Sequence, residues 1–290
     1  MANKEYKQMA NRVTIQGTLM DNTLEIKVDK NSRKYLSGEL EVMTDNECII
    51  PVSVFAYELK NSGEKNSIYD RLLKVVDTPS ARTVGAQQAP KVAISNARIE
   101  DNSFYSERDG KVVSNWRIGG SFIRTVANDA ITQNEFEVQG IVSSIKEYVD
   151  KDGNSTDAYN LKLLNVGFGN RVNELTFRFD DKEAVDYITS NYNPGDLVTL
   201  CGKIIYEQHE RTIEKELGFG EPIKQTYTNT VRLLKITAGT PAEDGAEAGY
   251  VLKDLQGIVV AQNNDITERY NARAQMTAAT NKAAGANLLF

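Results

Sequence analysis

The sequence predicts a mainly β protein built from two similar five-stranded units in tandem, followed by a partly helical tail. The 290-residue chain is long enough for two domains. Residues 11–19, NRVTIQGTL, reappear in modified form at residues 134–142, NEFEVQGIV, and both copies alternate apolar and polar residues around a glycine. The offset of 123 residues (134 minus 11) is about one small domain. We therefore expect domains at 1–130 and 131–240 and a tail at 241–290.

The composition is that of an ordinary globular protein, with 40% apolar and 26% charged residues. No apolar run approaches the ~18 residues of a membrane span, and the N-terminus lacks the apolar stretch of a signal peptide. Cys48 and Cys201 lie in apolar strand contexts, which predicts buried thiols in a reducing cytoplasm. With one histidine and no Cys-x-x-Cys motif, we expect neither a metal nor a cofactor.

The charge is unevenly distributed along the chain. The net charge of −6 argues against a protein that coats duplex DNA by bulk attraction. Residues 1–130 hold 18 Lys and Arg against 17 Asp and Glu, whereas residues 131–240 hold 12 against 17 and residues 241–290 hold 4 against 6. The first copy is therefore the better candidate for binding anions, because a groove can be positive on an acidic body.

The second copy shows the order of elements clearly. Apolar residues at 184, 185 and 188 have helical spacing, and the preceding Asp180-Asp181 supplies an N-cap. This predicts a helix from Lys182 to Ile188 between the third and fourth of five strands, in the order β-β-β-α-β-β. The alternating segments that we assign to strands are 136–148, 158–166, 172–179, 197–204 and 225–237.

The first copy fits the same order. Helical spacing predicts a helix over residues 67–76, and the Pro, Gly and Gln content of residues 78–90 predicts a mobile loop. Beyond Thr240, an Ala- and Gly-rich linker and a weakly apolar helical stretch predict a tail that is mobile or ordered by a partner. The strands expected here are 13–28 (interrupted at 21–22), 35–43, 48–57, 91–100 and 111–126.

This arrangement resembles the OB-fold, a five-stranded barrel of the same order and length. The strongest local match is the turn Asn193-Pro194-Gly195-Asp196 followed by the strand 197–204, in which Gly202 allows the curvature of a closing barrel. Over residues 11–240 the chain resembles tandem OB-fold single-stranded DNA-binding proteins of phages and bacterial mobile elements. The fold expected is therefore two OB-fold-like barrels in tandem.

The resemblance implies a sequence-nonspecific single-stranded DNA-binding protein of DNA replication or recombination, located in the host cytoplasm if phage-encoded. The expected partner is single-stranded DNA, and the protein could form an oligomer. The tail is a candidate contact for replication or recombination proteins. Bacterial proteins of this class end in an acidic tip with Pro-Phe. This chain ends in Phe290, but residues 283–289 contain neither an acid nor a proline, which departs from that pattern.

Single-strand binders need aromatic faces for bases and cations for phosphates. Alternation along the third strand of the first copy puts Val52, Val54 and Ala56 on the core face. Phe55 and Tyr57 then point away from the core, two residues apart, as a stacking platform requires. The alternative is that a helix, a loop or the second unit covers both rings.

Two further groups of candidates lie near this strand. The second strand begins with Arg33, Lys34 and Tyr35. Two cations beside an outward ring could contact a phosphate and a base. The alternative is that these residues form an ordinary solvated turn. Phe104 and Tyr105 lie at the expected exposed tip between strands four and five. OB domains use this loop for binding.

The last strand of the first copy completes this set. Trp116 shares parity with Ile118 and Phe122, which favours a core position for its indole and leaves Arg117 on the outer face. Arg124 lies further along the same segment. Trp116, Arg117 and Arg124 are accordingly kept as candidate contacts.

The second copy offers weaker candidates. Leu175, Phe177 and Phe179 share parity and are expected in the core, which leaves Arg178 on the outer face. Lys162 is outward between two leucines. The remaining candidates are two tyrosines that either stack on bases or lie at the core edge: Tyr159 and Tyr206.

Enzyme signatures are not found. The sequence has no phosphate-binding P-loop, no Gly-x-Ser-x-Gly elbow and no paired set of histidine and carboxylate, so we do not expect an enzyme. The competing hypothesis is a structural or assembly protein, such as a virion component, that uses OB-like barrels for protein contacts. The outward aromatic and basic residues of the first copy favour nucleic acid, whereas the acidic second copy favours the alternative.

Overall fold

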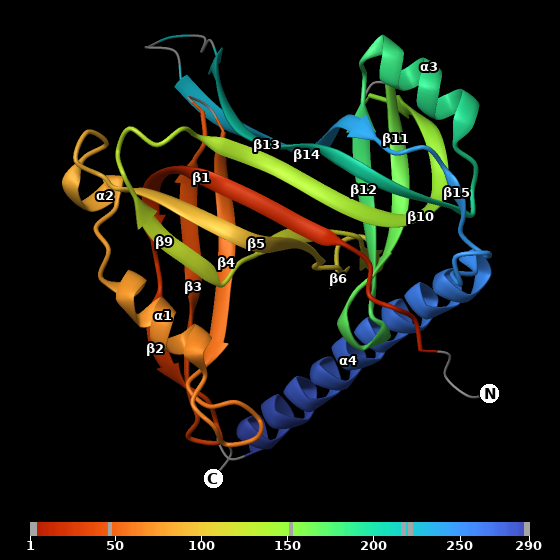
Figure 1. Ribbon diagram of the computed structural model, residues 1–290. Coiled ribbons are helices and arrows are strands. Elements are labelled where there is room, and N and C mark those ends of the chain that lie inside the picture. Colours follow the sequence, from red (N-terminus) through yellow and green to blue (C-terminus); the bar gives the residue numbers. More distant parts are fainter. Residues whose placement is uncertain (1–4, 46–47, 151–152, 216–218, 220–222, 287–290) are drawn as a thin grey trace.

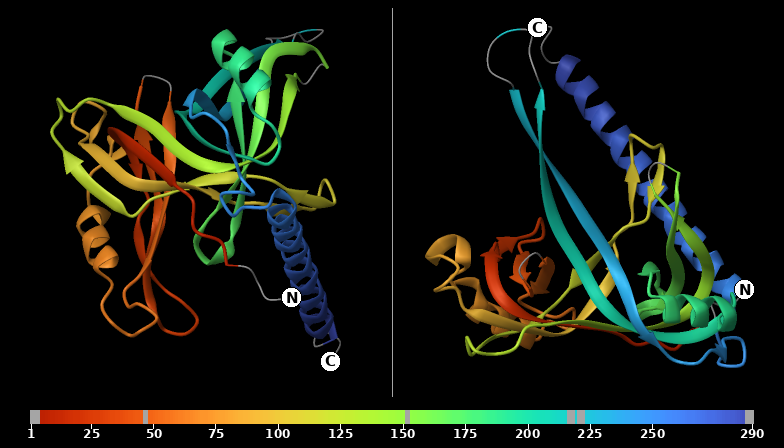
Figure 2. Two further views of the ribbon diagram at one scale, coloured as in Figure 1. Left: turned by 45° about the vertical axis from the view of Figure 1, so that its right-hand side comes forward. Right: turned by 90° about the horizontal axis from the view of Figure 1, so that it is seen from above.

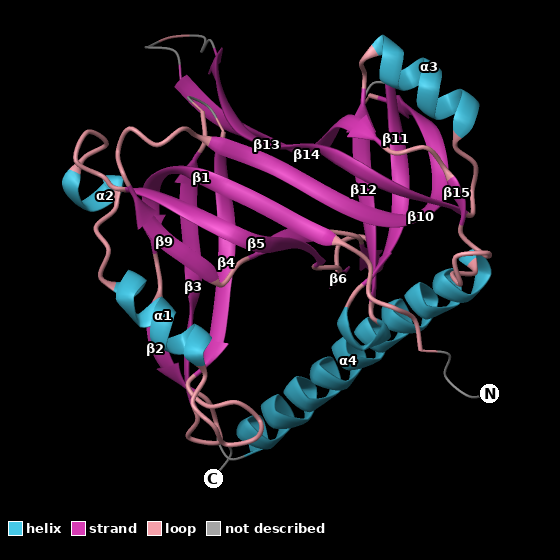
Figure 3. Cartoon of the chain, in the orientation of Figure 1, coloured by secondary structure: helices cyan, strands magenta, loops and turns pink. Residues whose placement is uncertain are grey.

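A computed structural model describes residues 5–45, 48–150, 153–215, 219 and 223–286. The chain is mainly β, with a 13-stranded sheet that runs through both halves of the molecule. A long helix crosses beneath the sheet (Figure 1), and shorter helices lie at the margins of the two halves (Figure 3). This confirms the mainly β class.

The C-terminal half contains a closed five-stranded barrel. Strand β10 pairs with β11 and β13, β11 pairs with β12, and β13 pairs with β14. A short parallel pairing of β12 with β14 closes the ring. The order β-β-β-α-β-β is confirmed. Its elements are β10 (Gln133–Val149), β11 (Ser155–Val166), η1 (Phe168–Asn170), β12 (Val172–Phe179), α3 (Lys182–Asn191), β13 (Asp196–Lys215) and β14 (Ile223–Gly239).

The N-terminal half uses the same order of pairing. Strand β1 pairs with β3 and β5, β3 with β4, β4 with β8 in parallel, and β5 with β8 and β9. Its elements are β1 (Asn11–Asn22), β2 (Glu25–Val28), β3 (Lys34–Met43), β4 (Ile49–Tyr57), α1 (Ser67–Val76), α2 (Ala81–Val84), β5 (Lys91–Asp101), β6 (Phe104–Ser106), β7 (Lys111–Val113), β8 (Trp116–Gly119) and β9 (Phe122–Val126).

Two segments of this half differ from the sequence-based expectation. The expected loop at 78–90 contains the short helix α2, whose first turn is tied by a hydrogen bond from the Ser80 amide to Thr83 Oγ1 (3.0 Å). The expected strand 111–126 is divided into β7, β8 and β9. The second break falls at Gly120-Ser121, where the Gly120 amide bonds the carbonyl of Ser53 on β4 (3.0 Å).

The repeated segment joins the two halves. Strands β1 and β10 pair antiparallel, and Val13 lies opposite Phe136, its own equivalent in the other copy. The repeat therefore has a local twofold relation, and the sheet continues from one half into the other through these two strands (Figure 1).

The first residue of each repeat makes the same pair of hydrogen bonds. The Asn11 side chain donates to the carbonyl of Ile99 (2.8 Å) and accepts from its amide (2.9 Å). Asn134 does the same with the carbonyl (2.6 Å) and the amide (3.0 Å) of Ile204. An asparagine side chain thus extends the ladder between the first and fourth strands in each half, where no backbone partner remains.

Glycine is required where strands cross closely. A Cβ at Gly17 would collide with the carbonyl oxygen of Met43, and one at Gly202 with that of Lys235. The pairing of β13 with β14 shifts register at Cys201/Gly202, which is a bulge. The expectation that Gly202 permits sharp curvature agrees with this geometry.

The alternation patterns of β4 and β12 place their core residues correctly. Val52, Val54 and Ala56 are buried, as are Leu175, Phe177 and Phe179 in the other half. The predicted helices form and cover the core with Leu72 and Ile188, and Asp181 caps α3 by accepting from the amides of Glu183 and Ala184. Both cysteines are free thiols. Cys48 is buried as expected, but Cys201 is only half-buried, and burial raises the pKa of each.

The predicted tail is largely one helix, α4 (Leu252–Ala286), preceded by the short strand β15 (Glu243–Asp244). Its first half packs on its own chain: Leu255 is buried, and Gln262 bonds both the amide and the carbonyl of Val172 (2.9 and 2.8 Å). From Asn271 to Thr277 every residue is exposed. The first half of α4 is therefore ordered by contacts within its own chain. Phe290 lies outside the described residues.

Candidate functional site

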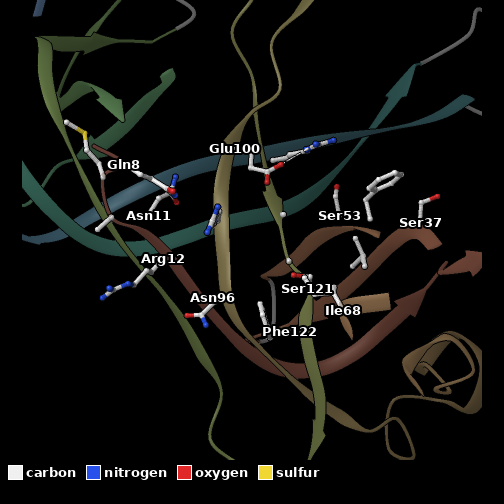
Figure 4. A pocket seen from close by; sticks show the side chains of 18 of the residues that line it. Gln8, Asn11, Arg12, Ser37, Ser53, Ile68, Asn96, Glu100, Ser121 and Phe122 are labelled. Atoms are coloured by element: carbon white, nitrogen blue, oxygen red, sulfur yellow. Dashed lines mark hydrogen bonds and ion pairs between the residues drawn. The ribbon is translucent and has the colours of Figure 1, made fainter. Parts of the chain in front are cut away.

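A groove of about 1240 Å³ crosses the N-terminal half. Figure 4 shows Asn11 and Arg12 of β1 on one side and Ser37 of β3 with Ser53 of β4 on the other, with Phe122 of β9 between them. The groove therefore includes the outward side of β3 and β4, the second and third strands of the order predicted for this half. In OB-folds this face and its neighbouring loops bind ligands.

An aromatic cluster stands at one end of this groove. The ring centroids of Tyr35 and Phe55 are 5.4 Å apart, and those of Phe55 and Tyr57 are 5.1 Å apart. Tyr35 lies directly opposite Tyr57 in the register of β3 with β4. Phe55 is 55% exposed and lines the groove, whereas both tyrosines are half-buried. The structure thus brings three predicted residues into one exposed patch, which we call the aromatic cluster.

Arg33 is held against this cluster. Its guanidinium carbon lies 4.4 Å from the Tyr57 ring centroid, and Nη2 donates to the Tyr57 hydroxyl (3.1 Å) and lies 2.8 Å from Asp29. Hydrogen bonds from the Arg33 amide and guanidinium hold the pKa of Asp29 below its usual range, so that this carboxylate stays charged. Arg33 is therefore an already paired cation, while the neighbouring Lys34 is exposed.

The groove is positive although the chain is acidic. Lys7, Arg12, Arg98 and Arg117 line it, against the single carboxylate of Glu100. Arg117 is ion-paired to Glu100 (3.2 Å) and Arg12 to Glu137 (3.4 Å). Lys7 and Arg98 have no ion pair to any described residue. Two cations of the groove are thus available to an incoming anion without breaking an existing pair.

The expectation that Phe122 faces the core with Trp116 and Ile118 is wrong. The side chain is 38% exposed and lines the groove. Because the strand is interrupted at Gly120-Ser121, the alternation shifts, and Ile123 packs against the core instead. The Arg71 guanidinium of α1 lies 5.8 Å from the Phe122 ring centroid. Phe122 therefore adds an aromatic surface beside a cation to the groove.

Trp116 is half-buried against the core, close to its expected place. Arg232 of β14 covers its ring at 3.9 Å and donates to Asn115 Oδ1 (3.0 Å). Burial lowers the pKa of Arg232, whose Nε is buried without a hydrogen-bond partner among the described residues. The hairpin of β13 and β14, which extends well beyond the barrel (Figure 2), thereby packs against the N-terminal half. Arg124 is exposed on β9, opposite Ala93 of β5.

The β6–β7 hairpin is held by the C-terminal helix. Phe104 at its start is 49% exposed, but Tyr105 stacks on Tyr270 of α4, with ring centroids 4.3 Å apart. The Tyr270 hydroxyl donates to Glu107 (2.9 Å), and this bond raises the pKa of Tyr270. One of the two predicted rings of the hairpin is therefore already stacked within the chain.

Replacing Tyr270 by alanine is expected to loosen this hairpin. The loss of a stacked aromatic pair, worth about 0.5–1.5 kcal/mol, should speed amide exchange in β6 and β7 roughly 2- to 10-fold. Hydrogen exchange read by mass spectrometry measures this, with Asn271→Ala on the exposed side of α4 as the control. Equal exchange in both variants would show that the stack does not hold the hairpin.

The candidates of the C-terminal half all have intramolecular partners. Tyr159 stacks on Phe179 (5.7 Å) and lies against the core, as does Tyr206. Lys162 is ion-paired to Glu174 (2.8 Å). The Arg178 guanidinium lies 3.4 Å from the Tyr148 ring and donates to Asn160 Oδ1 (2.8 Å). These side chains would have to give up existing contacts to bind a ligand.

Three cations and one aromatic residue of the groove lie outside the set predicted from sequence: Lys7, Arg12, Arg98 and Phe122. Alternation was sufficient to place Arg12 and Arg98 outward, since Val13, Ala97 and Ile99 beside them are core residues. Gly119-Gly120 was the signal for the break that turns Phe122 outward. No such signal marks Lys7, because it precedes the first strand. Its segment is held in place by a hydrogen bond from the Met9 amide to the carbonyl of Val166 (2.9 Å).

No cluster of three His, Cys, Asp or Glu side chains within the described residues is arranged to hold a metal ion. No helix in this part of the chain is long and apolar enough to cross a membrane.

The closed barrel of the C-terminal half is OB-fold-like. The fold is similar to the crystal structure of wild-type single-stranded DNA binding protein from Thermus aquaticus, with a TM-score of 0.50, 12% identity, and coverage of 81% of this chain and 94% of that one. A deletion mutant of the same Thermus aquaticus protein gives a TM-score of 0.49, 11% identity, and coverage of 81% and 95%.

The chain belongs to the YorF family, whose model matches residues 10–272. This match spans both halves and the first part of α4. No curated protein matches the sequence.

Proposed function

We propose that this protein binds single-stranded DNA without sequence preference, along the groove of its N-terminal half. The observation that carries the proposal is the juxtaposition of an exposed aromatic cluster with four cations and one carboxylate in that groove. Aromatic rings stack on bases of any sequence, and cations follow the phosphates. Phe55 and Phe122 would take bases, while Lys7 and Arg98 would take phosphates.

The architecture supports the same proposal. We infer that both halves are OB-folds in tandem, because their strands pair in the same order and start from the same repeat. The Thermus aquaticus protein of similar fold is named as a single-stranded DNA binding protein. A role in DNA replication or recombination, as a binding protein and not an enzyme, follows from this assignment.

The test is a fluorescence-anisotropy titration of oligo-dT and of a duplex of matched length, at several salt concentrations. We expect micromolar or tighter binding to the single strand. If the two unpaired cations or all four groove cations neutralise phosphates, the slope of log K against log salt is about −1.4 to −2.8. An oligo-U arm measures the preference for DNA over RNA.

Two results would contradict the proposal: no binding at low salt, or equal binding of the duplex. Absence of binding would favour the alternative, in which the OB-like barrel serves protein contacts in an assembly, whereas equal binding of the duplex would show that single strands are not preferred. That alternative predicts co-assembly with a protein partner and no dependence on oligonucleotide length.

A further inference from the structure

The groove does not end at the N-terminal half. A cleft of about 290 Å³ adjoins it at the junction of the two halves and shares Gln8, Asn11, Arg98, Glu100 and Arg117 with it. Beyond these shared residues the cleft is lined from the C-terminal half by Phe168, Arg171 and Asn173, among others. A chain lying in the groove therefore has a continuous path from β4 to the connection between β11 and β12.

The floor of the cleft is a fixed polar network. The buried Asn165 side chain donates to the carbonyls of Ala10 (3.1 Å) and Gln139 (2.8 Å). Its Oδ1 accepts from the side-chain amides of Asn11 and Asn173, both at 3.1 Å. Because these groups bond one another, the floor is rigid and contacts to a ligand must come from the rim.

The rim presents an aromatic ring on a well-held turn. Phe168 is 86% exposed at the tip between β11 and β12. The turn beneath it is held by the Gly167 amide, which donates to the carbonyl of Arg171 (2.7 Å), and by Asn170 Oδ1, which accepts from the Tyr6 amide (2.8 Å). The ring is therefore exposed although its backbone is fixed, which suits stacking at a small entropic cost.

A cation stands beside this ring. The Arg171 guanidinium lies 4.0 Å from Asp101, at the limit of an ion pair, and makes no hydrogen bond to another described side chain. The Arg171 side chain is 64% exposed, and that of Asp101 is 7% exposed. Arg98, without an ion pair to a described residue, lines the same cleft. The rim thus repeats the ring-plus-cation chemistry of the groove.

We propose that a bound single strand continues from the N-terminal groove through this cleft, where Phe168 stacks on a base and Arg171 contacts a phosphate. The inference rests on the proposed function and adds a second binding segment, contributed by the C-terminal half. In this inference the C-terminal half binds DNA through the turn between β11 and β12. The residues predicted from sequence in that half do not take part: Tyr159, Lys162, Arg178 and Tyr206.

The experiment compares the full chain with the variant Phe168→Ala/Arg171→Ala on two oligo-dT lengths, about 6 and about 30 nucleotides, within and beyond the reach of one OB-fold. Affinity for the short strand should change less than about twofold. Affinity for the long strand should fall about 5- to 150-fold, as expected for one lost stacked base. The salt slope for the long strand should also fall by about one.

The matched control is Lys182→Ala/Tyr187→Ala, which removes one cation and one exposed ring from α3, away from the cleft. It should bind both lengths as the unaltered chain does. A second measurement does not depend on a variant: a long strand carrying 5-iodouracil along its length should crosslink to Phe168, as mapped by mass spectrometry.

The outcomes separate the inference from the proposed function. If the unaltered chain binds neither length, the proposed function fails. If it binds both and the cleft variant binds the long strand equally well, only the inference is overturned. A variant that loses both lengths equally, or crosslinks that omit Phe168, would also overturn it.

Discussion

Replacing Phe55 and Tyr57 together by alanine is expected to weaken binding to oligo-dT more than any other surface change in the molecule. Each stacked base contributes about 1–3 kcal/mol, so the loss of Phe55 alone corresponds to about 5- to 150-fold in affinity. Tyr57 adds a second loss, because its ring packs edge-on against that of Phe55, with centroids 5.1 Å apart. An anisotropy titration at fixed salt measures both.

The single variants show which part of the cluster acts. Phe55 is 55% exposed, so Phe55→Ala should leave the fold intact. Tyr57→Phe keeps the ring and removes only the hydroxyl, which accepts from Arg33 (3.1 Å) and donates to Asp29 (3.5 Å), so we expect a smaller loss than for Tyr57→Ala. Tyr187→Ala on α3, 42% exposed and remote from the groove, is the matched control and should bind normally.

The dependence on salt distinguishes stacking from charge. The aromatic variants should keep the salt slope of the unaltered chain, because they remove no cation. Arg98→Ala should instead lower the magnitude of the slope by about one while reducing affinity for all sequences alike. Affinity of Phe55→Ala/Tyr57→Ala equal to that of the unaltered chain would show that these rings do not contact DNA.

The strands of both halves were predictable because the alternation that marks them lies within each short segment of sequence. Alternation of period two marks a strand with one buried face, and it located the buried residues of β4 and β12 correctly. The break between β8 and β9 does not follow from alternation, since it depends on the Gly120 amide finding Ser53 on another strand. The docking of α4 through Leu255 and Gln262 is likewise tertiary, because the partner surface is distant in the sequence.

The candidate site was predictable to the extent that it lies on one strand. Parity was enough to turn Phe55, Tyr57 and Tyr35 outward, whereas the register that sets Tyr35 opposite Tyr57 is a property of the folded sheet. Parity says nothing about which cations are already paired: Lys162 finds Glu174 across the neighbouring strand. The convergence of Lys7 and Arg98 in one groove is tertiary, because the segment before β1 is held by the hydrogen bond of the Met9 amide to Val166, which is distant in the sequence.

Replacing Phe177 by alanine is expected to be the most destabilising of the changes considered. Phe177 is fully buried on β12, with its ring centroid 5.3 Å from that of Phe136 on β10. A Phe-to-Ala change at such a site removes the buried apolar surface and leaves a cavity, which together cost about 3–5 kcal/mol. Urea denaturation followed by circular dichroism should show a correspondingly lower midpoint.

Phe168→Ala is the matched control, since it makes the same chemical change in the same half at a side chain that is 86% exposed. The free energy of unfolding should then change by less than about 0.5 kcal/mol. Equal destabilisation by the two variants would contradict the assigned core. A large loss from Phe177→Ala alone would show that Phe168 contributes little to folding, as its exposure predicts.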